Sequence, residues 1–239
     1  LELDALYEIV KSLQEYTYDV IYTDEDKFNN KTKVFEFPHF KPDFSIDLLR
    51  SYNYITHFFV ARTSLVHEVG GFRKEYDGAQ DYDLIFRCIE KANAVYHIPK
   101  VLYHWRMHPL STAANPKSKL YCYEAGQNAV QGNLDRSGIQ GSVELIGEPH
   151  WGCYYVDYKL DPQPLVSILI PNYESKEVLE RCINSLFKVN TYKNFEVIII
   201  ENNSTSKEIF AYYDQIQKEH DNIYVITWEG KGFNYSALN

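Results

Sequence analysis

The segment VSILIPNYESKEVLERCINSLF (166–187) decides the fold class of this chain. A run of β-branched and aliphatic residues ends at Pro171-Asn172-Tyr173, and apolar residues then recur at helical spacing. Such a run predicts a buried strand, and Ser175 is well placed to cap the helix that follows it. Strands that open directly onto a helix in this way commonly begin a nucleotide-binding α/β domain.

The same alternation continues to the C-terminal end of the chain. FEVIIIENN (195–203) reads as a second strand, a helix is expected over 206–219, and NIYVITW (222–228) reads as a third strand. Because the runs are uninterrupted rather than alternating, they predict parallel strands that are buried on both faces of the sheet.

The preceding residues are less regular. A helix is expected over 3–16, a short strand that runs into an acidic loop over 18–27, and a helix with an acidic first turn over 78–92. Residues 141–146 and 152–160 are expected to pair as a small β-hairpin. The segment DPQPL (161–165) has two prolines in five residues and is the best candidate for a linker.

Composition narrows the class of protein. Hydrophobic residues make up 45% of the chain, and no apolar run approaches the roughly 20 residues that span a bilayer. The net charge of −9 argues against nucleic acid as a partner, because phosphate backbones attract basic surfaces. The four cysteines lie far apart without a CxxC pair, which indicates buried free thiols in a reducing compartment: Cys88, Cys122, Cys153 and Cys182.

Several segments together resemble family 2 glycosyltransferases, which have the GT-A fold. SILIPNY, TYKNFEVIIIENNS and FNYSALN, within 166–239, resemble the beginning of such a domain. YTDEDK, GAQDYDLIFR and IPKVLYHWRMHPLSTA, within 1–115, resemble the end of one. The resemblance implies an α/β protein built of GT-A halves, incomplete or permuted, with a mostly parallel sheet flanked by helices.

This order of segments suggests a slice of a tandem-domain bacterial polysaccharide glycosyltransferase. Residues 1–160 would be the acceptor-side half of a first domain with the β-hairpin as an extension, 161–165 the linker, and 166–239 the nucleotide-binding half of a second domain. Alternatively, the two halves pack together as a permuted unit, or do so between two copies in a homodimer that exchanges half-domains.

The resemblance places a nucleotide site at the ends of two strands. Its candidate residues are Pro171, Asn172, Tyr173, Glu201, Asn202 and Asn203. The family usually has Asp where this chain has Glu201, so the contact with base or ribose is in doubt there. The alternatives are a plain strand-ending turn and a helix-capping turn.

In the inverting enzymes of the family, a carboxylate at a helix start deprotonates the acceptor hydroxyl. Asp81 matches that position, with Gln80 where many relatives have Glu. The helix dipole would keep such a carboxylate ionised, although Asp81 could instead be a helix N-cap. Arg87 lies four residues after Asp83, so the two are expected to pair along the helix.

The remaining assignments also follow from the resemblance. Arg106 and His108 are expected near the diphosphate or metal, and Asp24, Asp26 and Asp83 near the acceptor. The cofactor would be Mn²⁺ or Mg²⁺, and its Asp-x-Asp motif is expected to lie outside this chain, so the DED triplet at 24–26 is not taken as the metal site.

The sequence therefore predicts a glycosyltransferase fragment that uses a nucleotide-sugar donor, of the UDP or dTDP type, and a glycan acceptor. It would transfer the sugar with inversion, in the cytoplasm or at the inner face of the membrane, with peripheral membrane association of the parent. The first rival is a non-catalytic module that binds nucleotide or glycan, or serves as a scaffold through a swapped dimer. A dinucleotide-binding oxidoreductase is disfavoured because no GxGxxG follows the strand at Val166.

Overall fold

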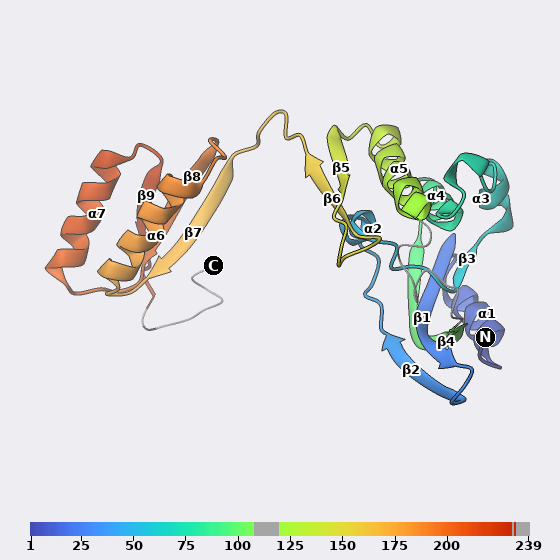
Figure 1. Cartoon of the computed structure of the whole chain (residues 1–239). Coiled ribbons are helices and arrows are strands. Elements are labelled where there is room, and N and C mark those ends of the chain that lie inside the picture. The colour runs from blue at the N-terminus through green and yellow to red at the C-terminus, as the bar shows by residue number, and fades with distance from the viewer. Residues whose placement is uncertain (108–119, 231, 233–239) are drawn as a thin grey trace. The chain divides into compact units, whose positions relative to one another are not determined.

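The computed structural model describes residues 1–107, 120–230 and 232. The chain divides into two compact units, Leu1–Lys159 and Leu160–Asn239, which we call the N-terminal and C-terminal units (Figure 1). The division lies next to the predicted linker, whose residues 161–165 are all exposed. No helix in the described ranges has the length and apolar character needed to cross a bilayer.

The C-terminal unit is a parallel three-stranded sheet with two crossover helices. Its elements are β7 (Val166–Asn172), α6 (Lys176–Val189), β8 (Phe195–Glu201), α7 (Lys207–Glu219) and β9 (Ile223–Thr227). The strands lie in the order β7-β8-β9, with Asn172 opposite Glu201 and Glu201 opposite Thr227. The predicted strand-helix alternation is therefore confirmed, and the carboxyl ends of all three strands meet at one edge.

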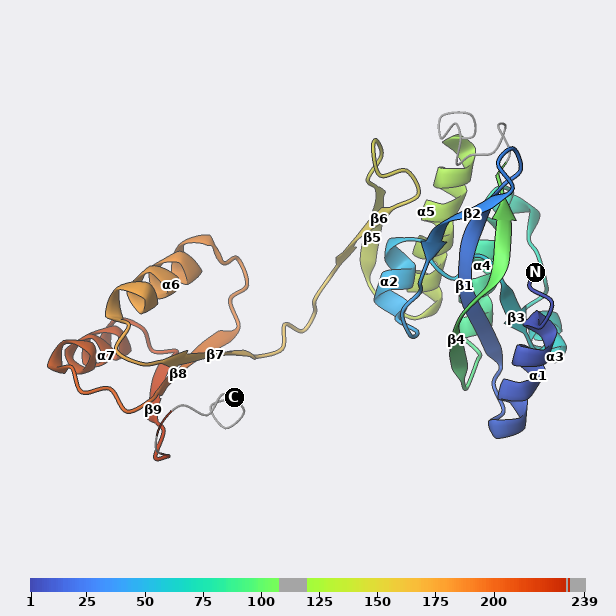
Figure 2. The same cartoon turned by 90° about the horizontal axis from the view of Figure 1, so that it is seen from below.

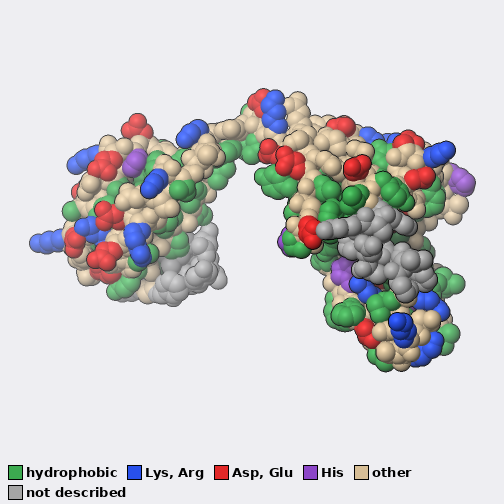
Figure 3. Space-filling model, in the orientation of Figure 1, with side chains coloured by type: hydrophobic (Ala, Val, Ile, Leu, Met, Phe, Trp, Pro, Cys, Tyr) green, Lys and Arg blue, Asp and Glu red, His purple; other side chains and the backbone are tan. Residues whose placement is uncertain are grey.

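Helices cover this sheet on one face. Figure 2 shows α6 and α7 on the same side of it. Side chains on that side form the core of the unit, with Val197 and Ile199 fully buried against Leu179, Ile183 and Ile209. On the outer side of these helices, acidic and basic side chains intermingle (Figure 3).

The opposite face of the sheet carries two rows of apolar side chains. The strand register aligns Leu169 with Ile198 and Tyr224, and aligns Pro171 with Ile200 and Ile226. Leu169, Tyr224 and Ile226 are 46%, 48% and 54% exposed. The prediction of burial on both faces is thus wrong for the described residues, because right-handed crossovers that step in one direction place both helices on one side.

The N-terminal unit has a mixed sheet centred on one strand. β1 (Val20–Asn29) pairs antiparallel with β2 (Val34–His39) and β3 (Phe59–Ala61), and parallel with β4 (Val95–Arg106). A mostly parallel sheet was expected, so this unit departs from the expectation while remaining α/β. β1 also extends through the acidic triplet, which was predicted to be a loop.

Helices and the hairpin complete the N-terminal unit. The helices are α1 (Ala5–Glu15), α2 (Ile46–Ser51), α3 (Thr63–Glu68), α4 (Gln80–Ile89) and α5 (Leu120–Arg136), with a 3-10 turn at Lys74–Tyr76. The predicted hairpin is confirmed as β5 (Gly141–Leu145) paired with β6 (Tyr154–Tyr158). The main core joins β1, α2, α4 and α5 through Tyr22, Leu49, Phe86 and Leu134.

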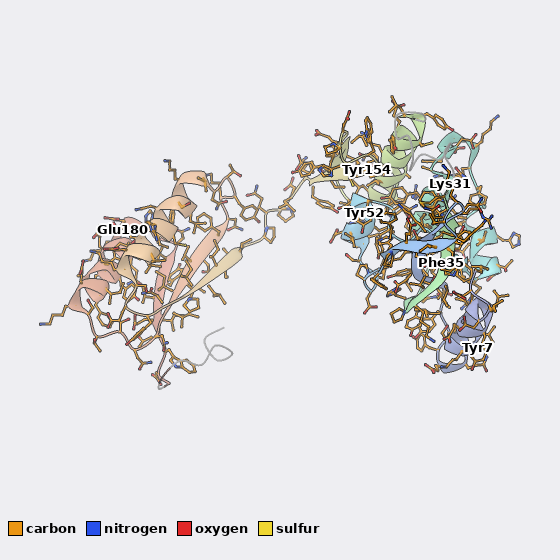
Figure 4. The ribbon with its side chains drawn as sticks, turned by 60° about the horizontal axis from the view of Figure 1, so that its bottom comes forward. Tyr7, Lys31, Phe35, Tyr52, Tyr154 and Glu180 are labelled. Atoms are coloured by element: carbon orange, nitrogen blue, oxygen red, sulfur yellow. The ribbon has the colours of Figure 1, made fainter. Side chains whose placement is uncertain are left out.

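The hairpin packs on α5 through a close approach. Tyr154 of β6, labelled in Figure 4, is 5% exposed and donates a hydrogen bond to the carbonyl of Tyr123. A Cβ atom at Gly126 would lie 1.9 Å from the Tyr154 hydroxyl oxygen, so glycine is required at that position of the helix.

One-sided burial in the C-terminal unit predicts unequal costs for two adjacent isoleucines of β8. Ile199→Ala removes a fully buried side chain from the helix-covered face and should cost about 2–4 kcal/mol of the free energy of unfolding of this unit. Ile198→Ala, on the half-exposed face, should cost under about 1 kcal/mol. Urea unfolding followed by the fluorescence of Trp228 measures both, and equal costs would show that the second face is also covered.

Candidate functional site

The strand ends of the C-terminal unit gather the predicted nucleotide-site residues. Asn172 ends β7 and Glu201 ends β8, and the backbone N–H of Asn202 donates to the carbonyl of Asn172. The loops after the two strands are also tied together, since Glu174 accepts hydrogen bonds from Thr205 and from the backbone N–H of Ser206. These two loops thus form one rigid rim at the edge of the sheet.

Two of the predicted residues turn inward. Glu201 is 1% exposed, and its carboxylate accepts hydrogen bonds from the hydroxyls of Tyr213 (2.6 Å) and Ser204 (2.9 Å). The Asn172 amide donates to the same Tyr213 oxygen at 2.7 Å. Burial, and then the hydrogen bond to Glu201, raise the pKa of Tyr213 well above its usual value, so it stays a hydroxyl that crosslinks the strand ends.

The longer side chain of Glu201, compared with the Asp that the family usually has, fits this arrangement. It lets the carboxylate reach back under the loop and cap Ser204 rather than point outward. Both carboxylate oxygens of Glu201 are therefore occupied by internal partners, and its contact with a nucleotide stays a prediction. Asn172 and Asn202 are 7% and 5% exposed and likewise support the rim.

The outward-facing part of the rim is smaller. Pro171 is exposed, Tyr173 is 58% exposed, and Asn203 is exposed in the left-handed region with φ of 60°. Asn203 is held there by hydrogen bonds from its amide to Asn202 and to the carbonyl of Gly230. These three are the predicted residues that a ligand could touch directly.

In the N-terminal unit, Asp81 lies in the first turn of α4, as the sequence predicts. It is half-buried in polar surroundings rather than enclosed by apolar packing. Its Oδ2 accepts hydrogen bonds from the Thr56 hydroxyl at 2.9 Å and from the Asn53 amide at 3.4 Å. Among the described residues no donor bonds to Oδ1, which leaves that oxygen able to take a proton.

Asp83 has a different environment two residues along the helix. It is fully buried, and its carboxylate is held by Arg73 and by Arg87, whose Nη2 lies 2.7 Å from Oδ2. The expected pairing with Arg87 is confirmed. Burial would raise the pKa of Asp83, but the hydrogen bonds from Arg73 and Arg87 outweigh it and hold the pKa below its usual range. The Asp83 carboxylate is thus held internally by the two arginines, and its place near the acceptor stays a prediction.

The acidic triplet of β1 is also bound internally. Asp24 is 3% exposed and accepts from the backbone N–H of Lys41 and from His97, both at 2.8 Å, and its place near the acceptor likewise stays a prediction. Asp26 is paired with His104 at 2.6 Å but remains partly exposed. Its place near the acceptor stays a prediction.

Arg106 ends β4 on the surface. Its guanidinium donates to the Asn30 side chain and lies over the ring of Phe28, 5.6 Å from the centroid. Its role near a diphosphate stays a prediction. His108 lies outside the described residues.

The fit of a divalent cation was tested on the donor groups present. In the described ranges no three His, Cys, Asp or Glu side chains come together in a way that could hold a metal ion. The oxygens nearest to such a role, those of Asp24, Glu25 and Asp26, are taken by lysine and histidine partners. We therefore derive no step through a metal from these residues.

Sequence reasoning missed four residues around Asp81: Lys41, Asn53, Thr56 and His57. Asn53 and Thr56 bond to Asp81, and His57 stacks on Tyr103 with ring centroids 5.0 Å apart. Lys41 is buried and bonds to the same segment. Their signal in the sequence is weak, since a lone lysine, an Asn and a Thr in an irregular segment are usually solvent-exposed side chains.

The different environments of Asp83 and Asp81 predict different costs for the same substitution. Asp83→Asn should destabilise the N-terminal unit by about 3 kcal/mol or more, because it leaves Arg87 buried without its counter-charge. Asp81→Asn, at a partly exposed site, should cost under about 1 kcal/mol. Urea unfolding followed by amide resonances of α4 measures both.

The pH dependence provides the check. Because the folded-state pKa of Asp83 is lowered, its contribution is present above its usual value of 3.8 and is lost as the pH falls through the folded-state pKa. The difference between the wild type and Asp83→Asn should therefore shrink below about pH 4. A difference that does not change over this range would contradict the ion-pair assignment.

The sequence of the chain is similar to a protein-family model and to two longer bacterial proteins. The sequence model described as Glycosyl transferase family 2 matches residues 167–239. The chain is 38% identical over 242 residues to the uncharacterized protein y4gI of Sinorhizobium fredii, an alignment that covers 100% of this chain and 26% of that protein. It is 36% identical over 220 residues to the O-antigen biosynthesis protein RfbC of Myxococcus xanthus, which covers 92% of this chain and 17% of that protein. The chain thus spans about a quarter or less of the length of these relatives.

Proposed function

We propose that this chain is part of an enzyme that transfers a sugar from a nucleotide-sugar donor to a glycan acceptor. The premise is membership of glycosyl transferase family 2, whose model matches residues 167–239. The similarity to a protein named for O-antigen biosynthesis supports a cell-surface polysaccharide as the product. The donor would carry UDP or dTDP.

The observation that carries this proposal is the geometry of the C-terminal unit. Open parallel sheets bind ligands in the crevice at the carboxyl ends of their strands. There the family-matched segment presents Pro171, Tyr173 and Asn203 on a rim that Glu201, Tyr213 and Asn172 hold together from below. A nucleobase would stack on the exposed ring of Tyr173, and polar groups of the Asn203 loop would bind the ribose or base.

The acceptor chemistry would belong to Asp81. Its Oδ1 takes the proton of an acceptor hydroxyl while the hydroxyl oxygen attacks the anomeric carbon of the donor sugar. The bond from that carbon to the diphosphate oxygen breaks, and the nucleoside diphosphate leaves with the electron pair. Attack from the side opposite the leaving group inverts the configuration. Thr56 and Asn53 would stabilise the ionised carboxylate before it accepts the proton.

Mn²⁺ or Mg²⁺ is the metal that the family implies, and it would offset the charge of the leaving diphosphate. The described residues offer no site for it, and we assign it no ligand here. Arg106 is a candidate for the same electrostatic task, as His108 is from the sequence.

A second candidate function is a non-catalytic module that binds nucleotide or glycan. It is favoured by the separation of the two residue sets, since Asp81 belongs to the N-terminal unit and Tyr173 to the C-terminal unit. Two results together would favour the binding module over the transferase. The chain would bind UDP without turning over a UDP-sugar, and Asp81→Asn would leave that binding unchanged.

We further propose a cytoplasmic setting with peripheral attachment to the inner face of the membrane. The four free cysteines support it, although only Cys88 is buried, Cys122 and Cys153 are partly exposed and Cys182 is exposed. Cell fractionation tests it.

A homodimer by exchange of half-domains is proposed on the exposed apolar rows of the C-terminal sheet. Light scattering that gives a monomer mass at micromolar concentration would exclude that dimer.

The nucleotide site predicts that Tyr173→Ala weakens binding of UDP by about tenfold, because it removes the stacking surface. Isothermal titration with UDP in the presence of Mn²⁺ measures the change. Tyr155→Ala is the matched control, since Tyr155 is also 58% exposed but lies in the hairpin of the N-terminal unit. Equal affinities for wild type and Tyr173→Ala would remove Tyr173 from the site.

The assignment of the base predicts a kinetic effect of Asp81→Asn in the whole protein. Loss of proton acceptance should lower kcat by about 10²–10⁴-fold while the affinity for the donor stays unchanged. Glu90→Gln, at the far end of the same helix and bonded to Arg136, is the control for general disturbance of α4. Retained activity in Asp81→Asn would assign the base to another residue.

A further inference from the structure

Lys41 is a buried cation in the middle of the N-terminal unit. Its side chain is 0% exposed, and its Nζ donates hydrogen bonds to Glu25 (3.4 Å) and to the carbonyls of Ile55 and Thr56 (both 3.0 Å), with a further bond to the carbonyl of His57. Burial lowers the pKa of Lys41 to about 8, against the raising effect of Glu25. Removing an ammonium from water is costly, so its retention calls for a reason.

The carbonyls that Lys41 binds belong to three consecutive residues, Ile55 to His57. Glu25 also holds this segment, because its carboxylate accepts hydrogen bonds from the backbone N–H and the ring Nδ1 of His57. Burial would raise the pKa of Glu25, but hydrogen bonds from His39 and His57 and the charge of Lys41 outweigh it, so the pKa falls to about 2. One ion pair thus fixes a whole turn of backbone.

The braced turn leads directly to Asp81. The same Thr56 that gives its carbonyl to Lys41 gives its hydroxyl hydrogen to Asp81 Oδ2 at 2.9 Å. Asn53 supports both, since its amide donates to the Thr56 hydroxyl oxygen at 2.8 Å and lies 3.4 Å from Asp81 Oδ2. A shift of the 55–57 backbone would therefore move the donors that hold the carboxylate.

A purely stabilising role does not account for this arrangement. Buried ion pairs can often be replaced by apolar side chains without loss of stability, so stability alone does not require the ammonium. What an apolar side chain cannot do is bind three converging carbonyls and set their directions. The contacts of Lys41 therefore fix the orientation of the 55–57 backbone.

We propose that Lys41 is a positioning residue for Asp81, acting through Thr56. It holds the turn 55–57 so that the Thr56 hydroxyl occupies Oδ2 and Oδ1 is kept for the proton of the acceptor. This inference rests on the proposed function only in naming Asp81 as the base, because the positioning itself is a property of the chain that can be measured without substrate.

The test follows the carboxyl signal of Asp81 by carbon NMR in the chain labelled with ¹³Cγ-aspartate, with Asp81→Asn used to assign the signal. Thr56→Val removes one donor to the ionised form, so the titration midpoint of this signal should move to higher pH by about half a unit to one unit. Lys41→Met should move it in the same direction. Lys27→Met is the control, because Lys27 is also a lysine of this sheet region but faces the rings of Phe37 and Trp105.

The double variant separates positioning from simple charge removal. If Lys41 acts through Thr56, Lys41→Met adds no further shift in the Thr56→Val background. A full additional shift would mean that the ammonium acts on Asp81 by its charge alone, and an unchanged midpoint in a folded Lys41→Met would mean that it does not act at all. Either result overturns the proposal.

Should Lys41→Met not fold, Lys41→Met/Glu25→Gln removes the unpaired carboxylate, and the wild type offers a route without mutation. Lys41 faces Glu25 and Asp24 of β1, while His39 and His57 face Glu25. As the pH rises through the titration of the Lys41 Nζ signal, the Thr56 amide and the Asp81 carboxyl should shift with the same midpoint. An Asp81 signal that stays constant through that range overturns the inference, whereas absence of UDP binding or of transferase activity would touch the proposed function alone.

Discussion

The N-terminal unit depends on the pairing of three adjacent carboxylates on its central strand with side chains from neighbouring segments. β1 pairs on both edges, so the backbone of Asp24, Glu25 and Asp26 is held within the sheet rather than free as in a loop. Each therefore takes an internal partner: His97 for Asp24, Lys41 for Glu25 and His104 for Asp26. These partners come from the chain segments on either side of β1, and the pairs fix those segments in place. The turn that supports Asp81 is one of the segments held in this way, through Lys41 and Glu25.

The sequence predicted the C-terminal unit almost in full, because long apolar strands and capped helices leave few alternatives. The helix expected over 206–219 lies within one residue of the observed α7, and the strand ends at Asn172 and Glu201 meet as expected. Burial on both faces could not be predicted safely. An apolar run indicates that a strand prefers burial, but it does not predict whether other elements of the chain cover both faces of the sheet.

The site in the N-terminal unit was harder to predict for a related reason. The helix start at Asp81 follows from local pattern, whereas the burial of Asp83 depends on Arg73, ten residues away in an irregular segment. Likewise, an acidic triplet after a strand resembles a solvated loop until the strand is seen to continue and find its lysine and histidines. The contacts that decide these roles are long-range in sequence, as between Lys41 and Glu25, and no periodicity encodes them.

The arrangement of β7 has a further consequence for handling the molecule. Among the described strands it is bordered by β8 alone, so one side of its backbone presents amide and carbonyl groups without a neighbouring strand. Its side chains Val166 and Leu169 are also well exposed. An unpaired edge strand of this kind can form backbone hydrogen bonds with an extended segment of another chain. At high concentration, unwanted fibrous or amorphous association of this chain should therefore begin at β7.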